Sequence, residues 1–443
     1  MIEILSDAVA ENPHKTAYIS GSEKITYSEL WELAQRYAFS LRGSKKPVLV
    51  KGEKEIHMPA AFLACIMASR PYVPCDTSLP EARIKKITEL SGADTVIDSS
   101  TIPSTEKLTV FENNDSDIAY IIFTSGSTGE PKGVPISRGN LKSFIKKLLL
   151  NTDSLNICKG KTVLNQAKFS FDLSVADIYF SLCTCSTLYA LTSHEQKEPR
   201  MMIDAMTESK ASLAVMTPTF AKYCLCMPEF NRHNLNELKT IFFCGETLEP
   251  KTVKKLFDRF PEIRIINAYG PTEATCAVCC AEITRDMCMS DIIPVGTTDN
   301  STCTITVEDN EILLCGNSVF LGYLGKDKIT PPYRTGDRGK IENGYIYCLG
   351  RMHGYIKYKG HRIEPDEIKS ALYSIDGVEQ CAVRIIKNTS DTVTGITAAV
   401  VSSTLEENGI KERLGKILPD YMIPKTISVS PKIGLNENGK QNI

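Results

Sequence analysis

The chain of 443 residues lacks the features that mark a membrane protein, a secreted protein or a nucleic-acid binder. Its longest uninterrupted apolar run, residues 60–68, is far shorter than the roughly 18 residues that a membrane-spanning helix needs. Its 51 Lys and Arg residues balance 53 Asp and Glu residues, so no excess of positive charge supports binding to nucleic acid or to an anionic membrane. The first residues include Glu3 and Asp7, whereas a signal peptide would begin with positive charge. We therefore expect a cytoplasmic protein that is not integral to a membrane and does not bind nucleic acid.

Histidine is also scarce, and this limits the metal sites that the sixteen cysteines could form. The six histidines are scattered, and Cys276 and Cys279 form a CxxC motif without a second pair at zinc-site spacing. Other cysteines lie in apolar runs, such as Cys65 and Cys315. We therefore expect buried, reduced thiols that pack as small apolar side chains, and no zinc site.

Short apolar runs alternate with helical segments over most of the chain, which is typical of a layered α/β architecture. We expect strands at residues 48–50, 119–123 and 240–243, and helices at residues 201–208 and 251–260. From about residue 299, short strands separated by Gly, Asn and Asp predict an antiparallel sheet. After Gly350 the pattern restarts as a compact α+β unit, with a helix at 365–373, strands at 380–386 and 396–401, and a helix at 405–417. We therefore expect two domains, residues 1–352 and residues 353–443.

A loop rich in glycine and hydroxyl groups follows the predicted strand at 119–123. Residues 124–133 read Thr-Ser-Gly-Ser-Thr-Gly-Glu-Pro-Lys-Gly. Glycine lets a loop bend and expose its N–H groups, and Ser and Thr add hydroxyl donors, so the loop suits phosphate oxygens. Its spacing fits neither the GxxxxGK[ST] phosphate loop nor a GxSxG nucleophile elbow. Taken alone, a Gly- and Ser-rich segment of this kind is more often a polar turn after a strand.

Further segments downstream favour the phosphate-binding interpretation. Residues 268–275 offer an aromatic ring, a tight turn and a carboxylate suited to Mg²⁺. Residues 333–337 end in a carboxylate that could accept both hydroxyls of a ribose. A basic segment follows at 350–364, and Gly439-Lys440 places a lysine on a turn near the C-terminus. Each segment alone is an ordinary turn, but their order along one chain is too specific to be coincidence.

Together these segments resemble the acyl- and aminoacyl-adenylate-forming enzymes, which include the adenylation domains of nonribosomal peptide synthetases. The resemblance covers nearly the whole chain. It implies a large N-terminal domain of layered α/β sub-sheets with a distorted β-barrel-like sub-sheet, followed by a small mobile α+β C-terminal domain. It also implies a reaction in which a carboxylate and ATP give an acyl-adenylate and pyrophosphate, after which a thiol takes the acyl group. Because this attack brings two anions together, positioning and charge neutralisation must supply most of the catalysis.

The resemblance assigns roles to individual residues. Lys440 would bridge the carboxylate and the α-phosphate, and Glu273 would hold Mg²⁺. His353 stands at the hinge between the domains, where the family usually has Asp. The residues assigned to the pyrophosphate end of ATP are Thr124, Ser125, Gly126, Ser127, Thr128, Gly129 and Lys132. Those assigned to the rest of the nucleotide are Glu246, Asn267, Ala268, Tyr269, Gly270, Thr272, Asp337 and Arg351.

Asp172 indicates which kind of carboxylic acid is activated. An Asp entering a helix is commonly an N-cap, but in the amino-acid-activating members of the family the matching Asp pairs with the substrate ammonium. Within the family, the segments at 166–175, 243–246 and 267–275 look most like the ligases that load D-alanine onto a carrier protein for teichoic acid modification. The residues assigned to the amino-acid pocket are Asp172, Leu173, Ala176, Val215, Phe242, Cys244, Ala268 and Cys276, together with Lys440.

This mostly apolar pocket predicts a small amino acid, with D-alanine favoured. The family usually has Met, Thr and Val at Ala176, Ala268 and Cys276, so another amino acid from a peptide pathway is an alternative. A coenzyme A ligase for a plain acid and a non-catalytic nucleotide-binding module are further alternatives. No carrier domain follows Lys440, so we expect the phosphopantetheine thiol to come from a separate carrier protein.

Overall fold

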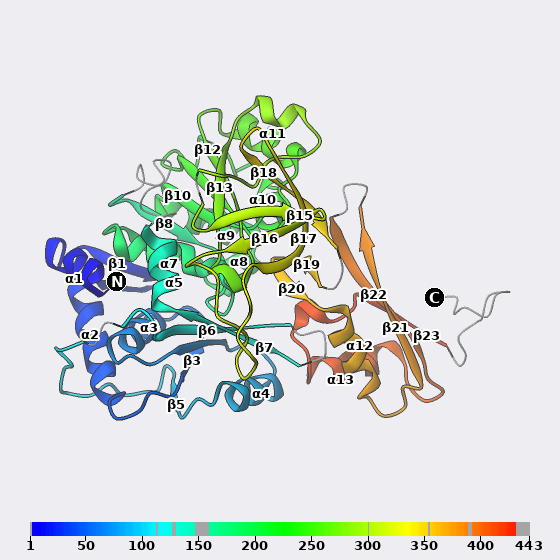
Figure 1. The fold of residues 1–443 in the computed structure, drawn as a ribbon, viewed down its shortest axis with the longest axis horizontal. Coiled ribbons are helices and arrows are strands. Elements are labelled where there is room, and N and C mark those ends of the chain that lie inside the picture. The colour runs from blue at the N-terminus through cyan, green and yellow to red at the C-terminus, as the bar shows by residue number, and fades with distance from the viewer. Residues whose placement is uncertain are drawn as a thin grey trace.

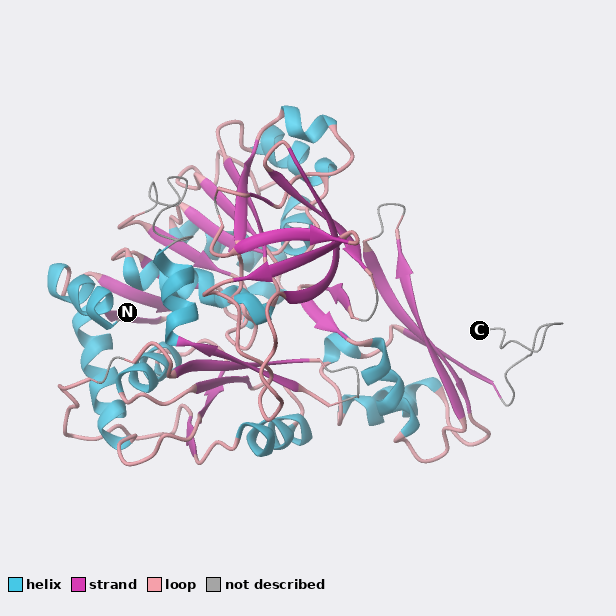
Figure 2. Cartoon of the chain, in the orientation of Figure 1, coloured by secondary structure: helices cyan, strands magenta, loops and turns pink. Residues whose placement is uncertain are grey.

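The computed structural model describes residues 2–111, 114–125, 130–146, 159–299, 301–352, 355–388 and 392–430. Two sheets with covering helices and a third, antiparallel sheet make up the part before residue 352, and a smaller α+β unit follows beside them (Figure 1). The expected α/β class is therefore confirmed (Figure 2). No helix within the described ranges has the length and apolar character needed to cross a bilayer.

The largest sheet has eight strands, and its central strands are parallel. Strands such as Leu213–Met216 are buried at every position, as expected where helices cover both faces of a sheet. In spatial order the strands are β13 (Cys279–Ile283), β12 (Arg264–Tyr269), β11 (Thr240–Phe243), β10 (Leu213–Met216), β8 (Thr162–Asn165), β9 (Thr187–Ala190), β1 (Thr16–Ser20) and β2 (Glu23–Thr26). The helices in this part of the chain are α1 (Ile2–Glu11), α7 (Leu173–Cys183), α8 (Ser193–Lys197), α9 (Pro199–Ser209), α10 (Pro218–Leu225) and α11 (Pro250–Arg259).

The second sheet ends at the glycine-rich loop. Its five strands run in the order β5 (Thr95–Ile97), β3 (Val48–Gly52), β4 (Tyr72–Asp76), β6 (Ile118–Thr124) and β7 (Lys132–Ser137). Helix α3 (His57–Met67) is buried along its whole length because it is apolar on every side. The other helices of this part are α2 (Tyr27–Ser40), α4 (Glu81–Ser91) and α5 (Arg138–Phe144).

The third sheet matches the antiparallel sheet expected after residue 299. Its strands run in the order β14 (Gly296–Thr297), β18 (Tyr345–Arg351), β17 (Tyr333–Glu342), β16 (Glu311–Cys315) and β15 (Thr304–Glu308). Cys315 corrects one expectation, because it is exposed at the end of β16 rather than buried. Every cysteine in the described part of the chain is a free thiol, and most are buried.

The C-terminal unit carries an apolar core of its own, which runs from Ile356 to Ile427. It contains the hairpin of β19 (Ile356–Tyr358) and β20 (His361–Ile363), then α12 (Pro365–Tyr373), β21 (Gln380–Lys387), β22 (Val393–Val401), α13 (Glu407–Gly415) and β23 (Thr426–Ser430). The helix expected at 405–417 thus begins two residues later and ends two residues earlier. The short 3₁₀ helices of the chain are Thr272–Ala274, Asp286–Met289 and Asp420–Met422.

Candidate active site

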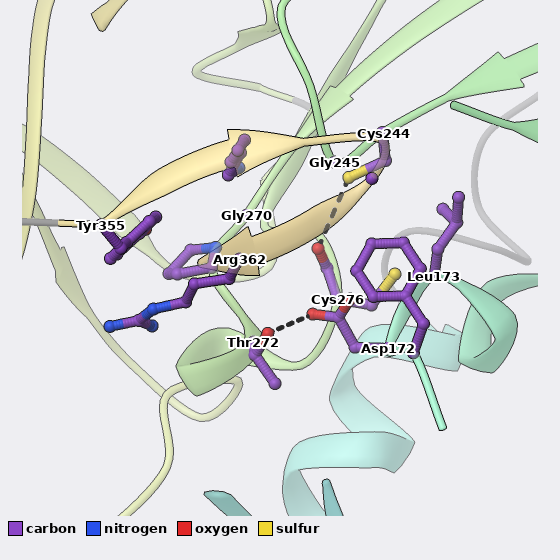
Figure 3. Close-up of a pocket in the computed structure, with 13 residues that line it drawn as sticks. Asp172, Leu173, Cys244, Gly245, Gly270, Thr272, Cys276, Tyr355 and Arg362 are labelled. Carbon is purple, nitrogen blue, oxygen red and sulfur yellow. Dashed lines mark hydrogen bonds between the residues drawn. The ribbon is translucent and has the colours of Figure 1, made fainter. Parts of the chain in front are cut away.

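Asp172 occupies the N-cap position of α7 but does not cap the helix. Its backbone is already helical (φ −62°, ψ −23°), and its side chain makes no capping hydrogen bond, so the N-cap interpretation is wrong. Instead its Oδ2 accepts a hydrogen bond of 2.6 Å from the hydroxyl of Thr272 (Figure 3). Burial raises the pKa of Asp172 above its ordinary value, although the Thr272 hydrogen bond and the charge of Lys357 oppose the shift. The site therefore holds a desolvated carboxylate that makes no ion pair closer than 4 Å with any described residue.

Asp172 lines a cavity of about 400 Å³, a volume that includes its open mouth. The described residues around it come from both parts of the chain: Phe171, Asp172, Leu173, Cys244, Gly245, Gly270, Pro271, Thr272, Cys276, Tyr355, Lys357, Gly360 and Arg362 (Figure 3). The structure thus brings together four residues expected in the amino-acid pocket, namely Asp172, Leu173, Cys244 and Cys276.

The other expected pocket residues are buried near these four but do not line the cavity. Ala176, Val215, Phe242 and Ala268 belong to the same apolar core cluster as Leu173, Cys244 and Cys276. Val215 and Phe242 are neighbours in the register of the parallel strands β10 and β11. Their predicted contact with the substrate stays a prediction.

Two thiols approach each other on one wall of the cavity. The Cys244 thiol donates to the backbone oxygen of Cys276 at 3.6 Å (Figure 3). Contact with the Cys244 thiol, together with burial, raises the pKa of the Cys276 thiol. The Cys276 thiol is therefore neutral, and the two sulfur atoms give this wall an apolar, polarisable character.

Asp337 and Arg351 form the next group of expected residues. They face each other across strands β17 and β18, and Arg351 Nη1 lies 2.9 Å from Asp337 Oδ1. The hydroxyl of Tyr269, at the end of β12, donates to the other carboxylate oxygen at 2.7 Å. Burial, followed by the charge of Asp337, raises the pKa of this Tyr269 hydroxyl. A carboxylate retains further acceptor positions in this arrangement, so Asp337 could still receive hydroxyl donors from a ligand.

Glu273 lies in the short 3₁₀ helix that follows Gly270. It is fully buried, and its Oε1 accepts hydrogen bonds from the hydroxyl of Tyr323 at 2.6 Å and from Arg362 Nη1 at 2.5 Å. Burial alone would raise its pKa, but the charge of Arg362 and these hydrogen bonds hold the pKa below its ordinary value. Its Oε2 is buried without a hydrogen-bond partner among the residues that the structure describes. Glu273 is thus ionised and has one oxygen free for a ligand.

The described ends of the glycine-rich loop lie beside the cavity residues. Thr124 and Lys132 are paired in register across β6 and β7. The hydroxyl of Ser125 donates to the backbone oxygen of Arg362 at 2.6 Å, whereas the hydroxyl of Thr124 is buried with no partner in the described ranges. Glu246 accepts from the N–H of Thr219 at 2.9 Å and also from the N–H of Gly360.

Several predicted site residues fall outside the residues that the structure describes: Gly126, Ser127, Thr128, Gly129, His353 and Lys440. Of the remaining nucleotide residues, Asn267 lies on the same strand as Tyr269, β12, and its side chain donates to the backbone oxygen of Pro294 at 2.9 Å.

Four residues in or next to the β19–β20 hairpin line the cavity but have no role predicted from the sequence: Tyr355, Lys357, Gly360 and Arg362. Tyr355 is buried between two guanidinium groups, with Arg351 3.6 Å and Arg362 3.8 Å from its ring centre. The concentration of positive charge at Lys357, Lys359 and Arg362 was the available signal. It did not indicate which carboxylates these cations would face.

Comparison with known proteins shows the family. A family model described as AMP-binding enzyme matches residues 5–111 and 101–324, so the chain belongs to the AMP-binding enzyme family, whose ligases use ATP. The resemblance expected from the motifs is confirmed.

Individual relatives extend the similarity to the full length. The D-alanine--D-alanyl carrier protein ligases of Bacillus licheniformis and Staphylococcus epidermidis are each 35% identical, over 99% of this chain and 97% of theirs. An adenylation domain of Vibrio cholerae, solved in complex with glycyl-adenosine-5'-phosphate, superimposes with a TM-score of 0.85 at 20% identity, covering 99% of this chain and 95% of that one. An o-succinylbenzoate CoA synthetase of Bacillus subtilis gives a TM-score of 0.82 at 19% identity, covering 99% and 97%. At these identities the two solved structures show the same fold as this chain and nothing about its substrate.

Proposed function

We propose that the protein activates a small amino acid, D-alanine, with ATP and transfers the aminoacyl group to the phosphopantetheine thiol of a separate carrier protein. In the first step a carboxylate oxygen of the amino acid bonds to the α-phosphorus, and the bond to pyrophosphate breaks. In the second step the thiol sulfur takes the aminoacyl carbon, its proton is released, and AMP leaves. The full-length similarity to D-alanine--D-alanyl carrier protein ligases supports this assignment.

The observation that carries the proposal is the desolvated carboxylate of Asp172 in a small cavity. A buried carboxylate whose hydrogen-bond donors are neutral, here the Thr272 hydroxyl and the Leu173 backbone, is stabilised when a ligand brings a cation. The α-ammonium of an amino acid supplies that cation, whereas a plain carboxylic acid does not. The neighbouring Leu173, Cys244 and Cys276 leave an apolar wall, which suits a methyl side chain and would leave a charged one unpaired.

The nucleotide residues support the ATP-dependent part of the proposal. Asp337 is buried beside Tyr269 and Arg351, and we assign it to the ribose hydroxyls. Thr124, Ser125 and Lys132, with the loop that they flank, are assigned to the phosphates, and Lys440 to the contact between the carboxylate and the α-phosphate. Each of these roles follows from the match to the family motifs.

Glu273 fits a magnesium ion. Its Oε2 is buried without a partner among the described residues, and no group of three or more His, Cys, Asp or Glu side chains gathers there or elsewhere in the described ranges. Mg²⁺ commonly takes only one or two carboxylates and completes its shell with water and substrate phosphates. When bound, the ion would neutralise phosphate charge, and Glu273 would hold it.

Amino-acid-dependent exchange of labelled pyrophosphate into ATP tests the proposal. We expect the strongest exchange with D-alanine in a panel that contains L-alanine, glycine, D-serine, L-serine, L-cysteine and larger residues. Strongest exchange with another amino acid would refute D-alanine but retain amino-acid activation. Silence with all of them, from folded protein that binds ATP, would refute the proposed function and favour a coenzyme A ligase or a non-catalytic nucleotide-binding module.

A further inference from the structure

The ring of Tyr355 packs against two arginines of the candidate site. Tyr355 is 3% exposed and lines the cavity just before β19 begins. The guanidinium carbon of Arg351, on β18, lies 3.6 Å from the ring centre, and that of Arg362, on β20, lies 3.8 Å from it. The labelled Tyr355 and Arg362 lie on the side of the cavity opposite α7 (Figure 3). One aromatic side chain thus contacts two cations of the site.

Hydrogen bonds alone do not satisfy these two guanidinium groups. The Nε atoms of Arg351 and Arg362 are both buried without a hydrogen-bond partner among the described residues. A buried donor without an acceptor is costly, but the negative face of an aromatic ring attracts a desolvated guanidinium. Burial, followed by the charge of Asp337, raises the pKa of Tyr355, so the ring is a neutral phenol. The ring therefore offsets part of the cost of burying both cations.

The ring also separates two positive charges. It can accept two guanidinium groups at these distances only on its opposite faces, because one face has room for a single planar group. Without the ring the two cations would repel each other across a space that water screens poorly. Each arginine has a carboxylate of its own, with Asp337 Oδ1 2.9 Å from Arg351 and Glu273 Oε1 2.5 Å from Arg362. The ring thus helps to keep each cation beside its own carboxylate.

Arg351 is the arginine whose position should depend more strongly on the ring. Its guanidinium packs closely on Gly336, where a hypothetical Cβ would lie 2.9 Å from Nη2. The Arg351 side chain is 21% exposed, whereas that of Arg362 is 15% exposed and lies near a second carboxylate, Glu364, at 3.8 Å. A displaced Arg351 would therefore reach water more easily. Removal of the ring should release Arg351 before Arg362.

Arg351 in turn orients the carboxylate that is assigned to the ribose. Asp337 Oδ1 accepts from Arg351, and its Oδ2 accepts from the hydroxyl of Tyr269 at 2.7 Å. Both oxygens are thereby held in one direction. Hydroxyl donors of a ribose need a fixed acceptor, because a hydrogen bond weakens steeply when its angle departs from the preferred range. The orientation of Asp337 therefore depends on an arginine that Tyr355 supports.

We propose that Tyr355 is a positioning residue for ATP, which holds Arg351 against Asp337 and so fixes the carboxylate that receives the ribose hydroxyls. The inference rests on the proposed function for the role of Asp337. It adds that one aromatic ring, shared between two cations, strengthens the preference for a ribonucleotide over a deoxyribonucleotide.

Calorimetric titration of the full chain with ATP and with 2′-deoxy-ATP tests the proposal. Tyr355→Leu removes the ring but keeps an apolar side chain, and it should raise the Kd for ATP about tenfold. The Kd for 2′-deoxy-ATP should rise less, so the preference for ATP should shrink several-fold. In pyrophosphate exchange, KM for ATP should rise with the Kd while kcat stays within a few-fold. A general loss of folding would instead affect both nucleotides alike.

Matched variants separate the ring from the rest of the side chain. Tyr355→Phe keeps the ring and should bind both nucleotides as the unmodified protein does. Tyr347→Leu removes a half-buried ring of the same sheet, whose centre lies 5.0 Å from Lys340 Nζ, and should change neither Kd. Tyr355→Gln also lacks a ring and serves if Tyr355→Leu does not fold. In an Arg351→Leu background, Tyr355→Leu should add little to either Kd, because its route to Asp337 is already lost.

The possible outcomes distinguish this inference from the proposed function. Unchanged Kd values in Tyr355→Leu would overturn the inference, as would equal rises for both nucleotides or effects that add fully to those of Arg351→Leu. If the unmodified protein binds ATP but supports no amino-acid-dependent exchange, the proposed function is refuted, and the two Kd values still decide the inference. If it binds no ATP, both are refuted.

Discussion

Asp172 and Glu273 are both buried carboxylates of one site, yet their pKa values shift in opposite directions. Burial dominates at Asp172 and raises its pKa, because its closest partner is the neutral hydroxyl of Thr272. At Glu273 burial also favours a higher pKa, but the charge of Arg362 and the hydrogen bonds to the carboxylate together outweigh it and lower the pKa. The difference indicates that Asp172 receives its cation from the substrate, while Glu273 already has one from the protein. A metal at Glu273 would therefore bind a carboxylate that already has a cation on its Oε1, whereas an ammonium at Asp172 would meet no directly paired cation.

The largest effect should follow from Asp172→Asn, which removes the charge at nearly constant size. The buried ammonium would lose its counter-charge, so kcat/KM for the amino acid should fall about 1,000-fold. Steady-state pyrophosphate exchange measures this, and ATP binding should persist. Asp258→Asn, which alters an exposed carboxylate on α11, is the matched control and should leave exchange unchanged. Retained activity in Asp172→Asn would show that the ammonium binds elsewhere.

A smaller loss is expected from Glu273→Gln, at about 100-fold in the exchange rate, because metal-dependent charge neutralisation is lost. This variant should also lower Tm, since the largely buried Arg362 guanidinium loses its nearer counter-ion and keeps only Glu364, at 3.8 Å, among the described carboxylates. Adding Arg362→Gln should recover part of that Tm loss. Glu282→Gln breaks an Arg–Glu pair at the surface, with Arg264, and should change neither quantity measurably. Additive Tm losses in the double variant would contradict the coupling.

The pH dependence of KM for the amino acid and of the Mg²⁺ requirement should distinguish the two carboxylates. The raised pKa of Asp172 means that it takes up a proton at a pH above its ordinary value of 3.8, whereas Glu273 keeps its charge to a pH below its ordinary value of 4.5. On acidification, KM for the amino acid should therefore rise first, by up to about tenfold per pH unit below the Asp172 pKa. The Mg²⁺ requirement should rise only at lower pH. Measuring both profiles checks the order, and simultaneous changes would contradict it.

The two carboxylates also show which parts of the site local sequence could predict. Apolar runs indicated the strands that end at Thr124 and Phe243, because burial on both faces leaves a continuous hydrophobic signature. The motif match then placed Asp172 and Glu273 among the functional residues. The partners of these carboxylates were missed, because Thr272 lies 100 positions from Asp172 and Arg362 lies 89 positions from Glu273. Such contacts depend on how separate sheets and units meet, and no periodicity within one segment encodes them.

The smallest expected effect concerns the wall beside Asp172. Cys244→Ala removes the thiol that donates to the backbone oxygen of Cys276 and enlarges the cavity by one sulfur atom. One group of this size in an apolar pocket changes discrimination by about 10-fold, so the preference for D-alanine over serine and larger residues should weaken while exchange with D-alanine stays within a few-fold. Competition between amino acids in the pyrophosphate exchange assay measures the ratio. Cys226→Ala, at an exposed cysteine, should leave it unchanged. Cys244→Ala could instead abolish exchange with every amino acid while the protein stays folded. The thiol would then act on the reacting groups, and the assignment of side-chain selection to this wall and ammonium binding to Asp172 would be wrong.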